Sequence, residues 1–463
     1  MAALLVVLEG QFGWLDAVNG HAFVALGNVA GIPETIKKDE AKVLVVTIDK
    51  TAAESRYLDR SPLDRCKLRD DISAVYSAMA NLNASRGVPS APAKGRLDLL
   101  VIDLDLSPAR WLAADPNRNA TEAKCEEDLH QRIIDADSKD QIHTVLMLPF
   151  ESSGPAATEV PTTWRTVEST VTFGLAGLPV EYGLVIRQYC DPNTLAASAY
   201  SKSEKLKGSR TNCIEDARGR LSRDAEHIDP RKYLSGVVPF AIGASSDLSQ
   251  RLARATDIPA NFKAVFFGAA FGEGDAFVTP LGDLYGVEIH AAAFLSLLDP
   301  LSANNHLSEL LADIIFGFVF GLIIASCWER YFKLRLSQDS DHRLCAPLWL
   351  LVLGAAVIVM AVVLTFVSLH LLARWGIWTS PIPMAVGMLV ESFVSGSVAQ
   401  GIRAADAIKG VGKPQRSSFR ESAKMFFGGD FDQLLRKGKK LSASLVALRL
   451  VLWMAVVGAA LSH

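Results

Sequence analysis

The sequence lacks the patterns that usually mark a catalytic or metal-binding protein. Its 463 residues include six cysteines, none in a CxxC pair or near a histidine at zinc spacing; such spacings are the usual signature of a zinc site. No Ser–His–Asp, Cys–His or paired-carboxylate hydrolase pattern is present either. Positive charge is not in excess, because the net charge is −3, and this balance does not favour a nucleic-acid partner. We therefore predict a non-enzymatic protein without a metal or other cofactor.

The N-terminus lacks a recognisable export signal. Met1–Leu8 is apolar, but no basic residue precedes it, whereas a signal peptide begins with a positively charged region. At ~20 apolar residues per membrane span, this stretch is also too short to cross a bilayer. We interpret residues 1–39 as a truncated or degenerate membrane anchor. Either a spanning helix precedes Met1 in the natural product, or Ala2–Leu26 is the degenerate anchor.

Residues 40–305 have the pattern of an α/β domain. Short apolar runs rich in β-branched residues suit strands buried on both faces of a parallel sheet, and helical stretches alternate with them. The expected strands are Val43–Ile48, Leu97–Ile102, Val145–Leu148, Leu184–Ile186 and Ala264–Phe267, and the expected helices include Leu68–Asn81 and Glu126–Asp137. We predict a mostly parallel central sheet, and we interpret the polar residues 191–232 as a long surface excursion.

Long apolar runs follow the α/β domain. Residues 306–463 contain about four stretches that approach the ~20 residues of a membrane-spanning helix. These stretches are 310–328, 346–372, 377–400 and 441–461. We predict that they form an all-α transmembrane bundle of about four helices in contact with membrane lipids.

The charges of the loops predict the orientation of this bundle. Lys and Arg residues are concentrated in the loops 329–345 and 401–440, whereas the turn between the second and third stretches holds only Arg374. The positive-inside rule places both basic loops in the cytoplasm and the α/β domain outside. The loop 401–440 also suits a segment that lies in the membrane interface or docks on a partner protein, rather than a solvated linker. Its large apolar residues are Phe419, Met425, Phe426, Phe427, Phe431, Leu434 and Leu435.

Four of the cysteines lie in the polar domain. If this domain is exported, their even number suits two disulfide bonds, because exported proteins fold in oxidising compartments. We pair Cys66 with Cys125 and Cys190 with Cys213. The alternative is that all four remain unpaired thiols.

Acidic residues follow several of the expected strands. Asp49, Asp103 and Asp105 come directly after two of them, and Asp275 follows a third after a short turn. In neighbouring parallel strands these carboxylates gather at the carboxyl edge of the sheet, where open α/β sheets bind ligands. There they could hold a hard cation or a cationic ligand. The alternative, which we favour, is that they cap loops by accepting hydrogen bonds from nearby backbone N–H groups.

The segment Asn261–Leu298 carries the most specific pattern in the chain. A lysine-led apolar strand is followed by a Gly-Ala turn, an aspartate, a Thr-Pro pair and a Gly-Val-Glu-Ile-His-Ala stretch. This order resembles the end of the type-2 CHASE domain, an extracytoplasmic sensor associated with cyclases and histidine kinases, although Tyr285 stands where that family usually has proline. The matching residues are Lys263, Gly268, Ala269, Asp275, Thr279, Pro280, Gly286, Val287, Glu288, Ile289, His290 and Ala291.

The resemblance covers roughly residues 40–300, with weaker support from 45–49 and 102–107. It implies an extracytoplasmic sensor flanked by membrane-spanning helices, without naming a ligand. Sensors of this family usually carry a kinase or cyclase domain after the helices, whereas here the sequence ends at His463, just after the last predicted span. We therefore expect a separate cytoplasmic signalling protein as the partner, and we leave a homodimer open.

Three smaller features allow both a functional and a structural interpretation. Gly268–Gly274 is glycine-rich, but no helix start follows it, so we expect a structural turn rather than a phosphate site. Glu288 and His290 would share a face if they lay on a strand; we favour a structural histidine over a metal pair.

Glu391 and Arg449 are lone charges near mid-bilayer of the last two spans. Because an unpaired charge there is costly, we predict that they form an ion pair inside the bundle.

The function that these features favour is sensing. We expect a membrane sensor that detects an extracytoplasmic stimulus and relays it to a separate cytoplasmic partner. The alternative is a transport or channel component whose extracytoplasmic domain forms a cap. Coupled transporters keep several charges inside the bundle. The predicted bundle has only Glu391 and Arg449 at depth, and this makes transport the less favoured alternative.

Overall fold

The computed structural model of the chain divides into two compact units, Pro33–Ser302 and a second one that combines Met1–Ile32 with Ala303–His463. We call them the α/β unit and the helical unit. The residues that the structure describes are 20–23, 42–58, 63–85, 97–106, 116–148, 170–181, 184–185, 187–189, 193–203, 225–229, 232–242, 262–272, 275–280, 282–298, 303–338, 340–375, 377, 379, 381–394, 396–408 and 426.

The α/β unit is built on a six-stranded sheet in which every strand pair is parallel. The strand order is β4-β3-β2-β10-β1-β9. The strands are β1 (Lys42–Asp49), β2 (Leu99–Asp103), β3 (His143–Leu148), β4 (Val171–Leu175), β9 (Val237–Ala241) and β10 (Phe262–Ala270). This sheet confirms the predicted parallel architecture, and four of the five expected strands lie in it.

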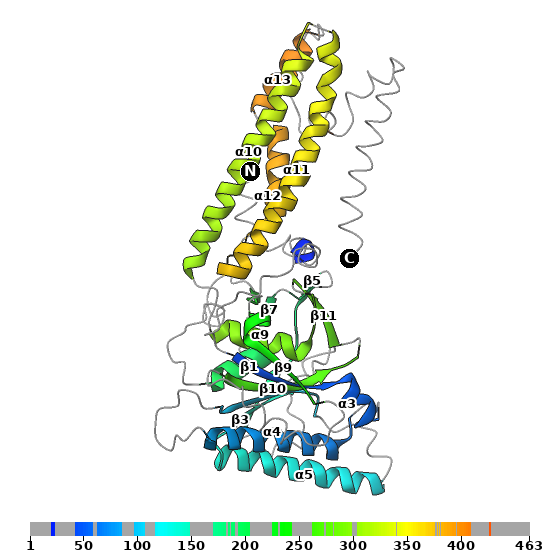
Figure 1. Cartoon of the computed structure of the whole chain (residues 1–463), viewed down its shortest axis with the longest axis vertical. Helices are drawn as coiled ribbons and strands as arrows, with labels where there is room; N and C mark the ends of the chain where they lie inside the picture. Colours follow the sequence, from blue (N-terminus) through cyan, green and yellow to red (C-terminus); the bar gives the residue numbers. More distant parts are fainter. Residues whose placement is uncertain are drawn as a thin grey trace. The chain divides into compact units, whose positions relative to one another are not determined.

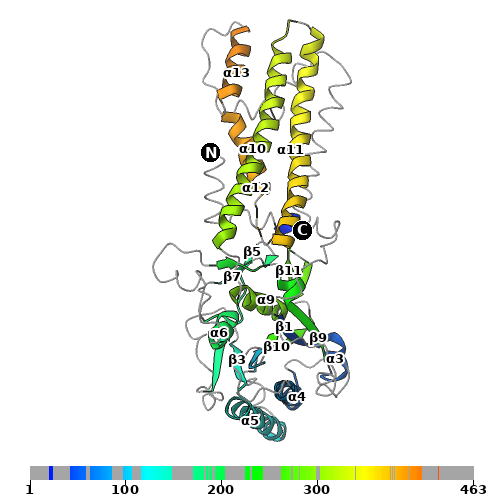
Figure 2. The same ribbon diagram turned by 60° about the vertical axis from the view of Figure 1, so that its left-hand side comes forward.

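Helices cover both faces of this sheet (Figures 1 and 2). Alternate residues of a strand point to opposite faces: Leu44 and Val46 belong to the core shared with α4 and α5, whereas Val43 and Val45 belong to the core shared with α6 and α9. Because both faces are buried, each inner strand must be almost continuously apolar. The helices are α3 (Lys50–Ser55), α4 (Arg65–Ser85), α5 (Pro116–Ser138), α6 (Leu195–Lys202) and α9 (Gly286–Leu298).

Two small sheets complete the described part of the α/β unit. One has the order β12-β11-β6-β5, and the other pairs β7 with β8. The strands are β5 (Val180–Glu181), β6 (Leu184–Val185), β7 (Arg187–Tyr189), β8 (Ala225–His227), β11 (Ala276–Thr279) and β12 (Gly282–Tyr285). The prediction that Leu184–Ile186 belongs to the central sheet is wrong, because Leu184 pairs with Val278 of β11. Its apolar character reflects burial in the core around α9, which includes Val185.

The interpretation of residues 191–232 as a surface excursion is wrong for its first part. Leu195, Ala196, Ala197, Ser198 and Ala199 of α6 are buried. The small side chains let α6 approach β4 so closely that a Cβ on Gly174 would lie 2.6 Å from the Cα of Leu195. Thr194 begins the helix, since its hydroxyl accepts the N–H of Ala197 at 3.2 Å. The chain is next described from β8, which is followed by the π-helical turn η5 (Lys232–Gly236).

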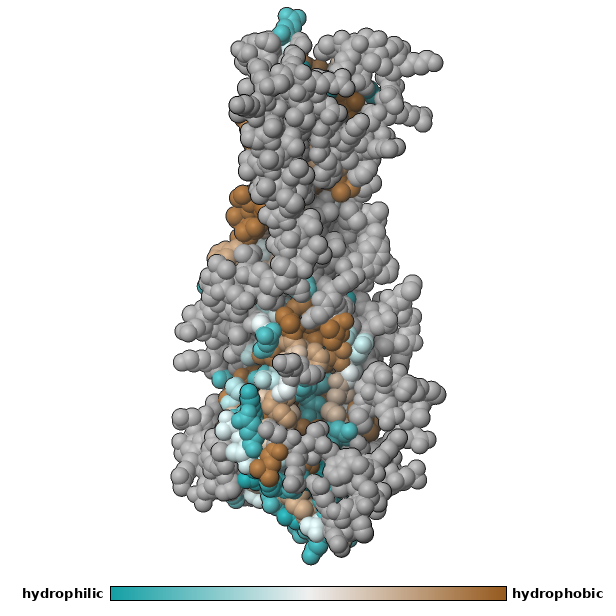
Figure 3. All heavy atoms as spheres, turned by 90° about the vertical axis from the view of Figure 1, so that its right-hand side faces the viewer, coloured by the Kyte–Doolittle hydropathy of each residue, from teal (hydrophilic) through white to brown (hydrophobic). Residues whose placement is uncertain are grey.

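The helical unit contains two long apolar helices, α10 (Ala303–Arg335) and α11 (Ser340–Trp375). Within them, Ile314–Arg335 and Leu348–Leu372 are each long and apolar enough to cross a membrane. Large apolar side chains on both helices are exposed, for example Phe318 at 66% and Val359 at 58%. Figure 3 shows hydrophobic side chains reaching the surface of this unit. Such exposure suits helices solvated by lipid rather than by water.

The predicted third span, 377–400, is helical over most of its described residues. The structure describes α12 (Pro381–Val394) and α13 (Gly396–Ile408) in this region, and residue 395 between them lies outside the described residues. Pro381 stands at the first position of α12, where the N–H that proline lacks would have no partner within the helix anyway. The predicted span 441–461 lies outside the described residues, and a bundle of four spanning helices is not confirmed.

Helix α12 packs closely on α10 at two glycines. A Cβ on Gly317 would lie 3.5 Å from the sulfur of Met384, and a Cβ on Gly321 would lie 2.9 Å from the Cε of Met388. Small residues that admit a neighbouring helix are typical of packing between helices in a membrane, where no hydrophobic force drives association.

Candidate functional site

The parallel register brings the ends of three strands together at the carboxyl edge of the sheet. Asp103, the last residue of β2, is opposite Gly268 of β10, and Asp49, the last residue of β1, is opposite Ala270. Leu99 and Val101 of β2 point into the core around α9. Because side chains alternate along a strand, Asp103 is also directed toward the α9 side of the sheet.

Asp275 reaches the same region from the start of β11. Gly286 is the first residue of α9, and a Cβ added to it would lie 2.7 Å from the carboxylate oxygen Oδ1 of Asp275. Next along the helix, Val287 lies against Gly268: a Cβ there would be 2.7 Å from Val287 Cβ and 3.3 Å from the carbonyl oxygen of Asp103. The two glycines of the Asn261–Leu298 pattern therefore leave room for the start of α9 beside these two aspartates.

The environment of Asp103 and Asp275 favours their neutral forms. Burial raises the pKa of Asp103 to about 7. Burial, and secondly the nearby charge of Asp103, raise the pKa of Asp275 to about 7. Two carboxyl groups with such pKa values change charge near neutral pH, and like charges in one site oppose ionisation of both. Chemically, the pair can take up or release protons in the neutral range.

The other two candidate aspartates have separate positions. Asp49 is the N-cap of α3, and its carboxylate accepts the N–H of Ala52 at 3.1 Å, which agrees with the capping interpretation. The side chain of Asp105 is exposed, and its backbone carbonyl accepts a hydrogen bond from Nη1 of Arg65 at 3.2 Å. The structure thus brings together two of the four predicted aspartates. Among the residues it describes, no three His, Cys, Asp or Glu side chains are arranged to hold a metal ion.

Glu288 and His290 do not form a pair, because they lie on α9 and not on a strand. Residues two apart on a helix point in different directions. Glu288 accepts the N–H of Tyr285 at 3.0 Å through Oε2, which is the backward half of a capping box. His290 is 4% exposed, and its Nε2 lies 3.2 Å from the carbonyl oxygen of Ala176. Burial lowers the pKa of His290 to about 4, which agrees with the interpretation of a structural histidine.

The Thr-Pro pair of the same pattern lies where β11 ends, with Thr279 as the last residue of the strand and Pro280 in the turn to β12. Thr279 is fully buried, and its hydroxyl donates a hydrogen bond to the carbonyl of Gly282 at 2.7 Å. Gly282 has φ +110°, a conformation that favours glycine. Thr279 and Pro280 therefore shape the hairpin that delivers the chain to α9.

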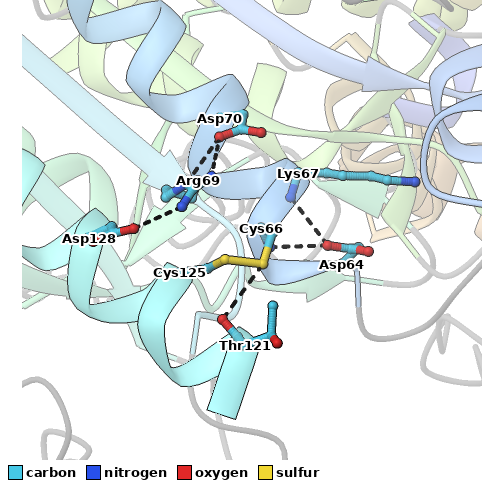
Figure 4. The surroundings of a disulfide bond; sticks show 8 residues. All are labelled: Asp64, Cys66, Lys67, Arg69, Asp70, Thr121, Cys125 and Asp128. Atoms are coloured by element: carbon cyan, nitrogen blue, oxygen red, sulfur yellow. Dashed lines mark hydrogen bonds and ion pairs between the residues drawn. A yellow bond between two sulfur atoms is a disulfide. The ribbon is translucent and has the colours of Figure 1, made fainter. Parts of the chain in front are cut away.

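The structure contains the predicted disulfide between Cys66 and Cys125 (Figure 4). It joins the first turn of α4 to α5 on the sheet face opposite α9. Asp64 caps α4 by accepting the N–H groups of Cys66 and Lys67 at 3.0 and 3.2 Å. Cys190 and Cys213, the other predicted pair, lie outside the described residues. So does Arg449, and the predicted ion pair with Glu391 stays a prediction.

Sequence reasoning missed a buried ionic network between α3 and α4. Asp71 is 1% exposed and accepts hydrogen bonds from Nε and Nη2 of Arg56 at 3.0 and 2.5 Å and from the hydroxyl of Tyr57 at 2.5 Å. Burial raises the pKa of Asp71, whereas Tyr57 and Arg56 oppose that rise. No local signal predicts this contact, because its partners lie about 15 residues apart, which matches no helix or strand period.

Comparisons of the chain with protein-family models, with curated proteins and with solved structures find no match. The similarity of Asn261–Leu298 to the type-2 CHASE domain therefore remains a prediction from its motif.

The raised pKa values predict a pH dependence of stability. Protonated Asp103 and Asp275 are favoured in the folded state, since their usual pKa is 3.8 and burial raises it to about 7. Their contribution is complete below pH ~4 and is lost as the pH rises through ~7. We compare the free energy of unfolding of the α/β unit in Asp103→Asn with that of the wild type at each pH. We expect this difference to be about 1–2 kcal/mol more favourable to the variant at pH 8 than at pH 5.

Chemical denaturation of the full-length protein in detergent, followed by circular dichroism at pH 5 and pH 8, measures this difference. Asp105→Asn is the matched control, because it removes an exposed carboxylate two residues away. If Asp103→Asn and Asp105→Asn change the pH dependence of the free energy of unfolding equally, burial of Asp103 is not its cause.

Proposed function

We propose that the chain is a membrane sensor whose α/β unit lies outside the cytoplasm and relays a stimulus to a separate cytoplasmic protein. The observation that carries this proposal is the combination of a disulfide-bonded α/β unit with helices long and apolar enough to cross a membrane. Disulfides persist in exported domains and are rare in the cytosol. A domain of this kind, attached to spanning helices, is suited to detecting conditions outside the cell.

Two further observations support a sensor. The pattern in Asn261–Leu298 resembles the closing part of an extracytoplasmic sensor family. In addition, its last element, α9, begins beside Asp103 and Asp275 and ends at Leu298, shortly before α10 begins at Ala303. Along the chain, α9 is therefore the one described helix between Asp275 and the first candidate span.

The relay can be tested in liposomes that contain the full-length protein. An environment-sensitive fluorophore is attached to a cysteine introduced at Ser417, in the basic loop, and the pH on the α/β side is changed from 8 to 6. The pH step is a handle on the charge of Asp103 and Asp275, whatever the natural stimulus is. We expect a fluorescence change that is reduced at least several-fold in Asp103→Asn and retained in Asp105→Asn.

The same liposomes distinguish the sensor from a transport component. A response at Ser417 without movement of ions or solutes across the bilayer supports the relay. Solute or ion flux that requires the protein, together with no Asp103-dependent response at Ser417, would overturn the sensor proposal in favour of transport.

A further inference from the structure

The helices α10 and α11 carry a cationic and aromatic surface near the turn that connects them. The guanidinium of Arg330 on α10 lies over the ring of Trp349 on α11, with its Cζ 4.8 Å from the ring centroid. A cation in this position is attracted electrostatically by the face of the indole. Figures 1 and 2 show the two helices side by side, and this contact links them at one end of the pair.

The same end of the helix pair coincides with the ends of both candidate spans. The first candidate span finishes at Arg335, and the second begins at Leu348. In a bilayer, Arg330 and Trp349 therefore lie at the depth where the hydrocarbon meets the lipid headgroups. Tryptophan is enriched at this depth, and long basic side chains extend from it toward the headgroups.

Two cations on this surface have no counter-charge within the described part of the chain. Arg330 and Lys333 are both exposed, and because they are three residues apart they share one side of α10. No described residue forms a hydrogen bond or an ion pair with either group. Glu329, which lies four residues before Lys333, does not pair with it. The surface therefore presents positive charge to its surroundings.

An apolar strip continues from this surface along α11. Its exposed residues are Leu348, Val352, Val359 and Val363. Their spacing of four, seven and four residues places them on one side of the helix, and Trp349 adjoins the first of them. Cationic side chains at the end of the second candidate span are thus followed by apolar side chains that lead toward its middle.

A molecule that fits both parts carries a negative phosphate group next to long acyl chains. Arginine can donate two parallel hydrogen bonds to one phosphate, and contact with the indole favours one position of the guanidinium. We propose that Arg330, Lys333 and Trp349 bind the headgroup of an anionic phospholipid, whose acyl chains lie along Leu348 and Val352. This site requires α10 and α11 to lie in a membrane, but it does not depend on sensing or on the orientation of the bundle.

Titration of the purified full-length protein in detergent with phosphatidylglycerol, followed by native mass spectrometry, measures the affinity of this site. Phosphatidylcholine with the same acyl chains is the reference lipid, because its headgroup has no net charge. Each basic residue near an anionic lipid surface contributes about 1 kcal/mol, which is a factor of about five. We expect Arg330→Gln to weaken phosphatidylglycerol binding about 5-fold, and Arg330→Gln together with Lys333→Gln about 25-fold, with little change for phosphatidylcholine.

Two further variants distinguish a defined site from general attraction to positive charge. Trp349→Leu keeps every charge but removes the ring beneath Arg330, and we expect it to weaken phosphatidylglycerol binding about 2- to 5-fold. Arg374→Gln is the matched control. Arg374 is an exposed cation whose Cζ lies 5.5 Å from the ring centroid of its neighbour Trp375, but it lies at the opposite end of α11. We expect this variant to bind phosphatidylglycerol like the wild type.

Helical circular dichroism and size-exclusion behaviour show whether each variant is folded. Equal affinity of the wild type for the two lipids would overturn the proposal, and so would an equal loss in Arg330→Gln and Arg374→Gln. Inorganic phosphate at millimolar concentration should leave the lipid bound. Its displacement by inorganic phosphate would indicate a site for free phosphate and contradict the lipid site. None of these measurements requires a signal, so failure of the sensor proposal would leave them unchanged.

Discussion

Replacing Cys66 and Cys125 together by serine is expected to lower the free energy of unfolding of the α/β unit by about 4 kcal/mol. The bond closes a loop between residues separated by 59 positions, and the chain-entropy estimate for a loop of this length is about 4 kcal/mol. The disulfide joins α4 to α5, so its loss frees these two helices from each other in the unfolded chain. Urea denaturation of the purified full-length protein measures the change.

Two comparisons make this test specific. Reduction of the wild type should produce a similar loss, whereas reduction should have little effect on the double variant. Cys327→Ser controls for loss of a thiol, because Cys327 is a free, buried cysteine in the helical unit. If wild type and double variant unfold at the same denaturant concentration under oxidising conditions, the disulfide does not stabilise the unit.

Replacing Asp71 by alanine is expected to lower the free energy of unfolding of the α/β unit by about 3–5 kcal/mol. Asp71 is almost fully buried and accepts two hydrogen bonds from Arg56 and one from Tyr57. Removing the carboxylate leaves the guanidinium of Arg56, which is 14% exposed, without its counter-charge, and an uncompensated buried charge is costly.

The neighbouring residue provides the control for this substitution. Asp70 is 56% exposed and pairs with Arg69 at the surface, where an ion pair contributes less than about 1 kcal/mol. Asp70→Ala should therefore unfold almost like the wild type under the same denaturant series. Similar losses for the two variants would show that the buried network around Asp71 does not stabilise the unit as argued.

The central sheet could be predicted because its strands are buried on both faces. Val43–Ile48 and Ala264–Phe267 are nearly continuous apolar runs, as an inner strand of a sheet covered by helices requires. Leu184–Ile186 shows the same local composition for a different reason, since Leu184 and Val185 are buried in a small sheet beside α9. Short apolar runs record burial, and they do not record which strand is the neighbour.

Local patterns were least informative at α6 and α9. Glu288 and His290 would share a face only on a strand, and four residues of sequence do not distinguish a strand from a helix. Glu288 lies three residues after Tyr285 and accepts its backbone N–H. A glutamate at this position of the first turn favours the start of a helix. In α6 the burial of small residues depends on contact with β4 and α9, which no short window of sequence contains.

The candidate site was predictable only in part for a related reason. The sequence placed four aspartates after strands, and the parallel register brings Asp103 to the carboxyl edge as expected. Which aspartates meet depends on the turns that follow: Asp49 turns back to cap α3, whereas Asp275 lies over Gly286. The rings of Phe393 and Phe426 are in contact although the two residues are 33 positions apart in the sequence, so only the three-dimensional structure reveals this contact.

Sensing across a membrane requires that the α/β unit and the basic loop lie on opposite sides of it. Single cysteines at Ser203, Gln338 and Ser417, in a background without unpaired native cysteines, can be labelled in intact cells with a membrane-impermeant thiol reagent. We expect Ser203→Cys to be labelled from outside. We expect Gln338→Cys, in the turn between α10 and α11, and Ser417→Cys to be labelled only after the membrane is opened. Labelling of the Ser203 and Gln338 positions from the same side would contradict this arrangement.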